Sequence, residues 1–310
     1  MSVSIVTPNF NNAPYVARFL ENLMTDAAVS EIVIYDNGST DGSPEMFEQL
    51  GAGKVRLLRG GANLGATLGR HEAVLAARNK FIFYLDGDDW VGPEAIHLSL
   101  ESLQRDKSDI ALLQVFEVDQ AGKNPALFLD PPASPIDGRT AASMAMGGWR
   151  IHSWGVMRKS LYERAWDGFE PHGFLSDEVL TRRILLHAGK VGGCEGKVFY
   201  RRVPKSYSPQ QLIDHGRTTV RSLALGVDNN LDAVAMRGQR RMTVRFMFGL
   251  ARRALRGRMP APAVADLLDE YFRIEQKWKL ADAPWAAVDG LLRVIRPLLG
   301  RPAPRCGAQG

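Results

Sequence analysis

Residues 81–90 read FIFYLDGDDW, and this stretch decides how the rest of the chain is interpreted. An apolar run, Phe81 to Leu85, is followed at once by three carboxylates, Asp86, Asp88 and Asp89. A short apolar run rich in aromatic and β-branched residues is typical of a buried strand. Carboxylates that follow such a strand lie where open α/β sheets bind their ligands.

Neighbouring carboxylates repel one another unless a positive group joins them. A hard divalent cation is a natural candidate for that group, because it takes oxygen ligands and often bridges to substrate phosphates. The alternative is a solvated acidic turn, since Asp and Gly are common turn residues. The segments around the motif favour the first interpretation.

Strand-like and helix-like segments alternate along the first part of the chain. Short apolar strands are expected at residues 4–6, 32–35, 55–58 and 81–85. Helices are expected to begin near Asn12, Ser43, Asn63 and Pro93. In the second of these helices, Met46, Phe47 and Leu50 are expected to face inward. Strands that alternate with helices pair in parallel through right-handed crossovers, so the pattern predicts a nucleotide-binding type of α/β sheet.

Polar residues follow three of these strands, as Thr7 to Asn11, Asp36 to Asp41 and Asp86 to Asp89. Three strand ends at one edge of a sheet would surround a single ligand, although each cluster alone is also compatible with a turn. The first strand is followed by TPNFNN instead of a Gly-x-Gly-x-x-Gly loop. The phosphates of a nucleotide would therefore be met by a metal and side chains.

Charge is unevenly distributed between the two parts of the chain. From Ser206 to Gly310, 17 Arg and Lys oppose 9 Asp and Glu, a net of +8, whereas the whole chain carries +5. Residues 1–205 therefore carry −3. We predict a catalytic domain at 1–205, a basic helical extension at 206–300 and a disordered tail at 301–310.

Residues 237–258 hold eight arginines and no acid, with apolar residues at helical spacing. This segment is predicted to be an amphipathic helix that lies on an anionic membrane or, alternatively, packs on the first domain. No specific binding to nucleic acid is expected. The two cysteines form no metal-binding or disulfide pattern, and no secretory leader or bilayer-spanning run is visible. We expect a cytoplasmic protein, with peripheral contact to the inner face of the membrane.

Four segments, SIVTPNFNN, EIVIYDNGSTDGS, NLGATLGRHEAVLAARNKFIFYLDGDDW and SDEVLTRRILLHAGK, occur in this order between Ser2 and Arg202. Together they resemble the family 2 inverting glycosyltransferases. The resemblance implies a Rossmann-like nucleotide-diphospho-sugar transferase (GT-A) fold with a C-terminal helical extension. It also implies transfer of a sugar from a nucleotide-sugar, expected to be a UDP-sugar, to a glycan or lipid-linked acceptor. A catalytically idle nucleotide-sugar or glycan binder on this fold is the alternative.

The resemblance assigns roles on the donor side of the site. Thr7, Pro8 and Asn9 match the segment that lines the nucleotide base, and Asp36 matches the carboxylate that binds the uracil ring. Arg70 matches an arginine that contacts the diphosphate. Asp88 is the expected direct ligand of Mn²⁺ or Mg²⁺, while Asp86 is expected to contact ribose or a metal-bound water.

The resemblance also assigns the general base and the acceptor side. Asp177 matches the carboxylate that activates the acceptor hydroxyl, with Glu178 as the second choice and Ser176 as a helix cap. The acceptor side is expected to include Trp149, His152, Trp154, Asp89 and Trp90, although the tryptophans are as compatible with a core position.

One difference from some relatives concerns the metal shell. Those relatives complete it with a histidine downstream of the base, whereas the matching stretch here reads YRRVP at 200–204. Arg201 and Arg202 in that stretch are expected either to contact the diphosphate or acceptor or to be solvated.

Overall fold

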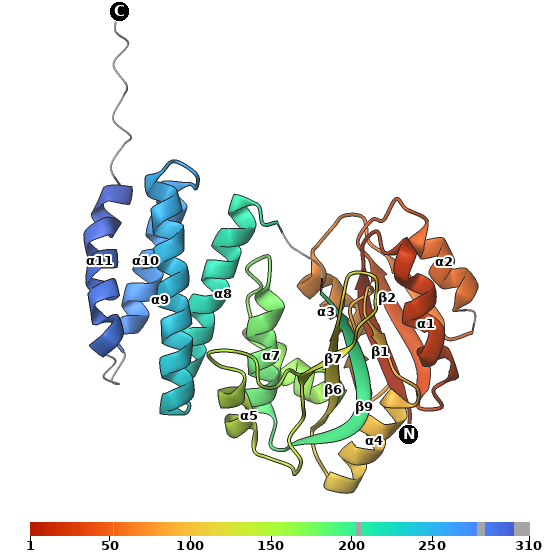
Figure 1. The fold of residues 1–310 in the computed structure, drawn as a ribbon. Helices are drawn as coiled ribbons and strands as arrows, with labels where there is room; N and C mark the ends of the chain where they lie inside the picture. Colours follow the sequence, from red (N-terminus) through yellow and green to blue (C-terminus); the bar gives the residue numbers. More distant parts are fainter. Residues whose placement is uncertain (52, 203–205, 278–282, 301–310) are drawn as a thin grey trace, which may run out of the picture. The chain divides into compact units, whose positions relative to one another are not determined.

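The computed structural model describes residues 1–51, 53–202, 206–277 and 283–300, and for 283–286 it describes the backbone alone. The chain divides into two compact units, Met1–Lys205 and Ser206–Gly310. The first unit combines a sheet with helices, and the described part of the second unit is helical (Figure 1). The tail at 301–310, predicted to be disordered, lies outside the described residues.

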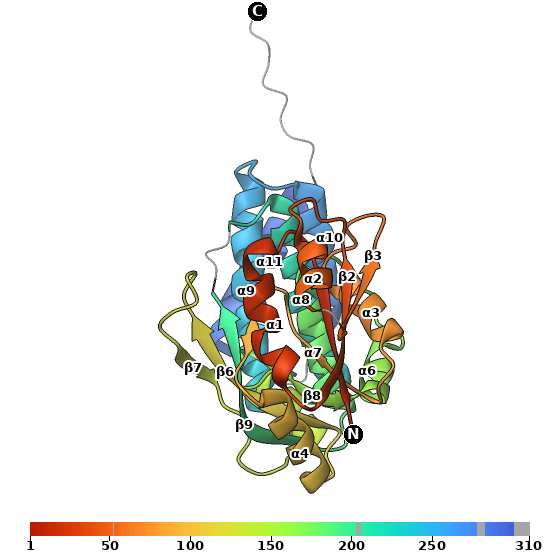
Figure 2. The ribbon, with the colours of Figure 1, turned by 90° about the vertical axis from the view of Figure 1, so that its right-hand side faces the viewer.

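Within the described residues, a mixed sheet of nine strands forms the core of the first unit. The strands are β1 (Val3–Asn9), β2 (Val29–Asp36), β3 (Val55–Arg59), β4 (Phe81–Tyr84), β5 (Trp90–Val91), β6 (Ile110–Val118), β7 (Ala126–Leu129), β8 (Gly155–Arg158) and β9 (Val191–Arg201). They are ordered β3-β2-β1-β4-β8-β6-β9-β5, and β7 pairs with β6. The four strands from β1 to β4 pair in parallel, whereas β8 is antiparallel to both β4 and β6. Figure 2 shows β6, β7 and β9 side by side.

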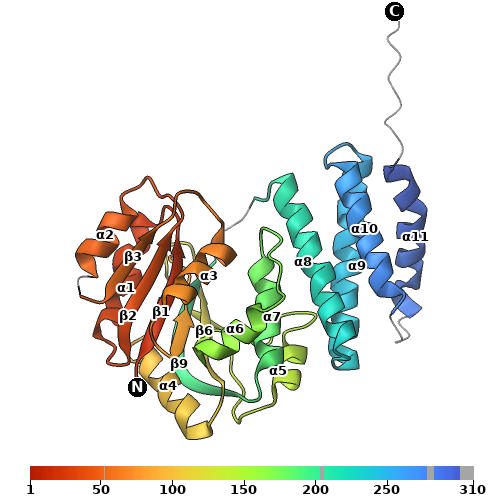
Figure 3. The same cartoon turned by 180° about the vertical axis from the view of Figure 1, so that it is seen from behind.

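Helices cover both faces of this sheet. They are the 3₁₀ helix η1 (Ala13–Tyr15) and the α-helices α1 (Val16–Thr25), α2 (Ser43–Leu50), α3 (Ala66–Ala76), α4 (Ala95–Asp106), α5 (Gly138–Met144), α6 (Lys159–Trp166) and α7 (Ser176–His187). Helices α1 and α2 lie on one face of the parallel strands, and α3 lies on the other (Figures 1 and 3). Helices α5 and α6 both pack against α7. The predicted α/β fold class is confirmed.

The parallel strands bring the predicted polar segments together. β1 is buried along its whole length because it lies between β2 and β4 with helices on both faces, so its sequence lacks polar alternation. The register sets Asn9 beside Asp36 and Val6 beside Tyr84. The residues that follow β1, β2 and β4 therefore meet at one edge of the sheet.

Several element boundaries differ from the prediction. The helix expected to start at Asn63 starts at Ala66, because the Asn63 side chain accepts a hydrogen bond from the Gly65 N–H and holds a turn. The helix expected at Pro93 starts at Ala95. Leu50, expected to face inward, is 47% exposed because it is the last residue of α2, where the helix ends.

The second unit consists of four helices within its described residues: α8 (Pro209–Asp228), α9 (Ala233–Leu255), α10 (Ala261–Glu275) and α11 (Ala283–Leu299). A buried polar cluster joins three of them: Arg240 of α9 pairs with Glu275 of α10 at 2.8 Å and with Asp289 of α11. The Tyr271 hydroxyl also donates to Asp289. Among the residues that the structure describes, no helix has both the length and the apolar character needed to cross a bilayer.

Close packing between strands makes Gly155 a test of this sheet. A Cβ atom at Gly155 would lie 2.1 Å from the Ala111 carbonyl oxygen of β6, and the ladder prevents either strand from moving away. We expect Gly155→Ala to lower the free energy of unfolding by about 1–3 kcal/mol in urea. At Gly61 a Cβ meets no atom within 4 Å, so Gly61→Ala should stay close to wild type. Equal stability of the two variants would contradict this packing.

Candidate active site

A cavity of about 530 Å³ opens beside the carboxyl end of β4. Its wall includes Asp86, the start of α3 and the first turn of α7. The Ser176 hydroxyl donates to Thr67 Oγ1 at 2.9 Å and so joins the two helix starts. Helix N-termini carry partial positive charge, so the two helix starts favour an anionic group, whereas Asp86 and Asp177 on the same wall favour a cation.

Arg70 of α3 connects the two acidic sides of this cavity. Its guanidinium is 3% exposed, with Nη2 2.7 Å from Asp86 Oδ1 and Nη1 3.5 Å from Asp177 Oδ2. The Tyr84 ring lies under the guanidinium at 4.7 Å. Burial alone would lower the pKa of Arg70, but the two carboxylates raise it above the ordinary value. Arg70 is therefore a fixed positive charge at the centre of the site.

The acidic motif after β4 places its three carboxylates differently. Asp86 and Asp88 are each 34% exposed at the side chain, whereas Asp89 is buried. Burial raises the pKa of Asp88, and the neighbouring Asp86 raises it further, while Arg201 opposes the shift. Burial and the two other carboxylates raise the pKa of Asp89 well above its usual range. The motif therefore favours the approach of positive charge.

Arg201, the last residue of β9, provides positive charge on the second side of the motif. Its Nη2 lies 2.7 Å from Asp88 Oδ2, and its backbone N–H donates to Asp89 at 2.9 Å. The Tyr15 ring stacks on the guanidinium at 3.8 Å. Asp86 and Asp88 thus each have an arginine partner.

The same two carboxylates are the residues that fit a metal. Among the described residues, no group of three or more His, Cys, Asp or Glu side chains is arranged to surround an ion. Asp86 and Asp88 are hard oxygen donors, which suit Mg²⁺ or Mn²⁺. These two side chains would hold such an ion, which would supply further positive charge at this edge of the sheet.

The first turn of α7 separates the two candidate bases. Asp177 lines the cavity beside Arg70, whereas Glu178 lies 3.7 Å from Arg182, one helical turn further on. Ser176 is not the helix cap that was expected: Leu175 occupies that position in a left-handed conformation, and Ser176 is the first helical residue.

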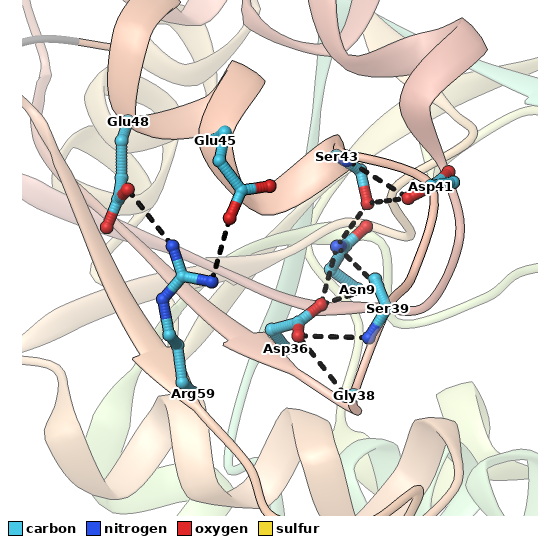
Figure 4. Close-up of polar contacts among 9 residues, drawn as sticks. All are labelled: Asn9, Asp36, Gly38, Ser39, Asp41, Ser43, Glu45, Glu48 and Arg59. Carbon is cyan, nitrogen blue, oxygen red and sulfur yellow. Dashed lines mark hydrogen bonds and ion pairs between the residues drawn. The ribbon is translucent and has the colours of Figure 1, made fainter.

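The ends of β1 and β2 form a separate polar cluster (Figure 4). The Asp36 carboxylate accepts hydrogen bonds from the Asn9 amide at 2.8 Å, from the Ser39 hydroxyl and from the N–H groups of Gly38 and Ser39. Asn9 also contacts the Ser43 hydroxyl at 2.9 Å. Four donors saturate a carboxylate, so Asp36 is held in one orientation.

Thr7 and Pro8 lie in β1 just before this cluster and are both buried. Pro8 approaches α3, because a Cβ at Gly69 would be 3.3 Å from the Pro8 Cβ and 2.8 Å from the Asn37 amide nitrogen. The glycine thus lets α3 lie close to the end of β1.

The predicted acceptor side is an aromatic cluster around His152. The imidazole lies between Trp149 at 4.9 Å and Trp154 at 4.1 Å. Trp154 is buried, whereas Trp149 is partly exposed and has the Arg182 guanidinium over its ring at 4.0 Å. Of the two tryptophans, Trp149 is therefore the one that offers surface to a ligand.

Asp89 and Trp90, which were also expected on the acceptor side, lie in the interior instead. Asp89 holds the backbone of Arg201, and Trp90 stacks on Phe199 at 5.5 Å with Arg18 over its ring. β5 pairs with β9 at this point, so both side chains are used to close the sheet.

Sequence reasoning did not identify Arg182 and Tyr200. For Arg201 it left two alternatives, contact with the diphosphate or acceptor and exposure to solvent. Arg182 is fully buried and donates to the Ala145 and Glu178 carbonyls. Burial and the three motif carboxylates raise the pKa of Tyr200 to about 12. Glu178 and Arg182 are one helical turn apart in sequence, and this spacing is a signal that could have identified their ion pair.

Comparison with known families identifies the class of protein to which this fold and site belong. The Glycosyl transferase family 2 profile matches residues 4–168, which include the strand ends, Arg70 and the acidic motif. The chain belongs to this family and is a glycosyltransferase.

Individual relatives match different lengths of the chain. Glycosyltransferase GlyG of Streptococcus pneumoniae serotype 4 is 22% identical over 214 residues, which cover 64% of this chain and 70% of GlyG. Chondroitin synthase of Pasteurella multocida is 32% identical over 108 residues, 34% of this chain but 11% of that protein. The crystal structure of Staphylococcus aureus TarS 1–349 in complex with UDP-GlcNAc superposes with a TM-score of 0.68 at 16% identity. That match covers 96% of this chain and 88% of the TarS chain and shows a shared fold.

The environment of His152 makes stability depend on pH. Its Nδ1 atom is buried without a hydrogen-bond partner, and burial with the charges of Arg70 and Arg182 lowers its pKa from 6.5 to about 3. Below pH 6.5 the unfolded chain binds a proton that the folded protein excludes, so stability falls as pH falls.

We therefore expect His152→Phe to lose less stability than wild type as the pH is lowered from neutral to about 5, by at most about 1.4 kcal/mol per pH unit. Urea unfolding at each pH measures the difference, and the other histidines are common to both proteins. Parallel loss of stability in the two proteins would mean that the pKa of His152 is ordinary.

Proposed function

We propose that this glycosyltransferase is a metal-dependent, inverting enzyme that moves a sugar from a UDP-sugar to a glycan or lipid-linked acceptor. The observation that carries the proposal is the position of Arg70 between Asp86 and Asp177. This position would set a diphosphate-binding side and a candidate base on two sides of one cavity. The preference for a UDP-sugar is supported by the likeness to TarS, whose structure holds UDP-GlcNAc.

On the donor side, Arg70 would bind the diphosphate, because a guanidinium fork matches phosphate oxygens. Asp88, with Asp86 directly or through water, would hold Mn²⁺ or Mg²⁺, which stabilises the negative charge of the leaving nucleoside diphosphate. Thr7, Pro8 and Asn9 with Asp36 would form the wall for the base. Since Asp36 already accepts four hydrogen bonds, a uracil N–H would replace one of them.

Asp177 would act as the general base toward the acceptor hydroxyl. Inversion requires attack from the side opposite the leaving group, so the base and the diphosphate must lie on different sides of the sugar. Asp177 approaches Arg70 from α7, whereas Asp86 approaches it from β4, and this arrangement supports Asp177 in that role. Glu178 is a weaker candidate because its carboxylate is directed to Arg182.

The acceptor would bind next to Trp149. The Arg182 guanidinium supports one face of this ring, so its position is set before any ligand arrives. A sugar ring stacks on an aromatic face through its C–H groups, which suits a glycan acceptor. Asp89 and Trp90 would contribute only by holding β5 and β9.

The base assignment predicts a difference between two neighbouring carboxylates. We expect UDP-sugars with Mn²⁺ to raise the melting temperature of wild type and of Asp177→Asn alike, since ligands that bind the folded state stabilise it. Release of UDP from the stabilising donor should fall by about 10²–10⁴-fold in Asp177→Asn. Glu178→Gln, the matched control, should retain release close to wild type.

Three results would contradict these assignments. Full UDP release by Asp177→Asn would exclude it as the base, and loss of release in Glu178→Gln alone would transfer the role to Glu178. A wild-type protein that no nucleotide-sugar stabilises with Mn²⁺ or Mg²⁺ would count against the proposed donor.

We further propose that one face of α9 contacts an anionic membrane surface, which would suit a lipid-linked acceptor. Val234, Arg241, Arg245, Arg252 and Arg256 follow one another at helical spacing and are exposed, and residues 233–258 contain no acid. Of the eight arginines in this stretch, Arg240 is excluded from this face because it is buried against α10 and α11.

The membrane proposal predicts a salt-sensitive affinity for acidic lipid. We expect the protein to float with vesicles that contain phosphatidylglycerol and not with pure phosphatidylcholine. The triple variant R245Q/R252Q/R256Q should bind about 100-fold more weakly, since each surface arginine contributes about 1 kcal/mol. The control R18Q/R59Q/R105Q removes equal charge from exposed positions of the first unit. Equal losses in the two variants, or no flotation of wild type, would contradict the proposal.

A further inference from the structure

Arg201 forms an ion pair with Asp88, the carboxylate that a bound divalent cation would need. Its guanidinium donates to Asp88 Oδ2 at 2.7 Å, and its Nε lies 3.4 Å from the Asp88 carbonyl oxygen. A cation bound to the same oxygen would be next to this guanidinium, and two positive charges at such a distance repel strongly in a partly buried site.

The position of Arg201 is built into the fold. The side chain is 7% exposed, Tyr15 of η1 stacks on it, and its own N–H is held by buried Asp89. Its neighbour Arg202 differs in every respect: its side chain is 72% exposed and pairs with Glu117 on the surface at 3.2 Å. The two consecutive arginines therefore have different roles.

Charge balance explains why a guanidinium belongs beside Asp88. Asp86, Asp88 and Asp177 lie around two guanidinium groups, Arg70 and Arg201, so the three ionised carboxylates leave a formal charge of −1. A divalent cation would more than neutralise this charge, and a nucleoside diphosphate would then add negative charge again. A guanidinium that can leave Asp88 and donate to the diphosphate would balance the charge both with and without the bound ligands.

We propose that Arg201 is an exchangeable counter-ion of Asp88, an inference that rests on the proposed function. In the free enzyme Arg201 holds Asp88 and keeps the affinity for a divalent cation low. When the cation and the nucleoside diphosphate bind together, Arg201 leaves Asp88 and donates to the diphosphate. The cation and the nucleotide thus bind cooperatively, and each raises the affinity of the site for the other by the same factor.

Binding of Mn²⁺ and UDP to purified full-length protein tests this exchange without any need for the acceptor. Isothermal titration calorimetry measures the affinity for Mn²⁺ alone and the affinity for UDP at saturating Mn²⁺. In Arg201→Met, which keeps the apolar stem, we expect Mn²⁺ alone to bind about tenfold more tightly and UDP to bind about tenfold more weakly. Arg201→Lys keeps the charge and should lie between this variant and wild type.

Arg202→Met is the matched control, because it removes the same charge from the adjacent residue, and both affinities should equal those of wild type. Melting temperatures of all variants establish that they are folded. Unchanged affinities in Arg201→Met, or weaker binding of Mn²⁺ alone, would overturn the inference, since Arg201 would then not compete for Asp88. A wild-type protein that binds no UDP with Mn²⁺ would instead overturn the proposed function itself.

Discussion

The ion pairs of Arg70 are the interactions on which the site depends. A buried guanidinium is costly unless it is paired, and Arg70 finds its two partners in Asp86 after β4 and Asp177 at the start of α7. These two ion pairs join the sheet to α7 and set the two walls of the cavity. In the neighbouring aromatic cluster, burial and then the charges of Arg70 and Arg182 lower the pKa of His152.

The acidic motif depends on the same kind of compensation. Asp86, Asp88 and Asp89 follow one another closely and are partly or fully buried, yet each has a donor, from Arg70, from the Arg201 side chain and from the Arg201 N–H. Removal of either arginine side chain would leave a partly buried carboxylate without its ion-pair partner. The site is therefore organised around the positive charge of Arg70 and Arg201, which the protein itself supplies.

Much of the fold could be predicted because its signals are local. The strands of the parallel half are short apolar runs, and polar residues follow them, so β1, β2 and β4 were identified together with their shared edge. Helix starts were less predictable, because a side-chain turn at Asn63 and a left-handed residue at Glu94 each delay the helix. The buried positions of Asp89 and Trp90 were not predicted, because the pairing of β5 with β9 is not visible in either strand alone.

The sequence by itself determined the family, the α/β sheet and the acidic edge, because periodicity and motif spacing are properties of neighbouring residues. The tertiary structure alone decided which carboxylate faces the cavity. Asp177 and Glu178 are adjacent in sequence, but the turn of α7 directs one to Arg70 and the other to Arg182. It also set Arg201 on Asp88, and not the adjacent Arg202, because successive residues of an extended chain point to opposite sides.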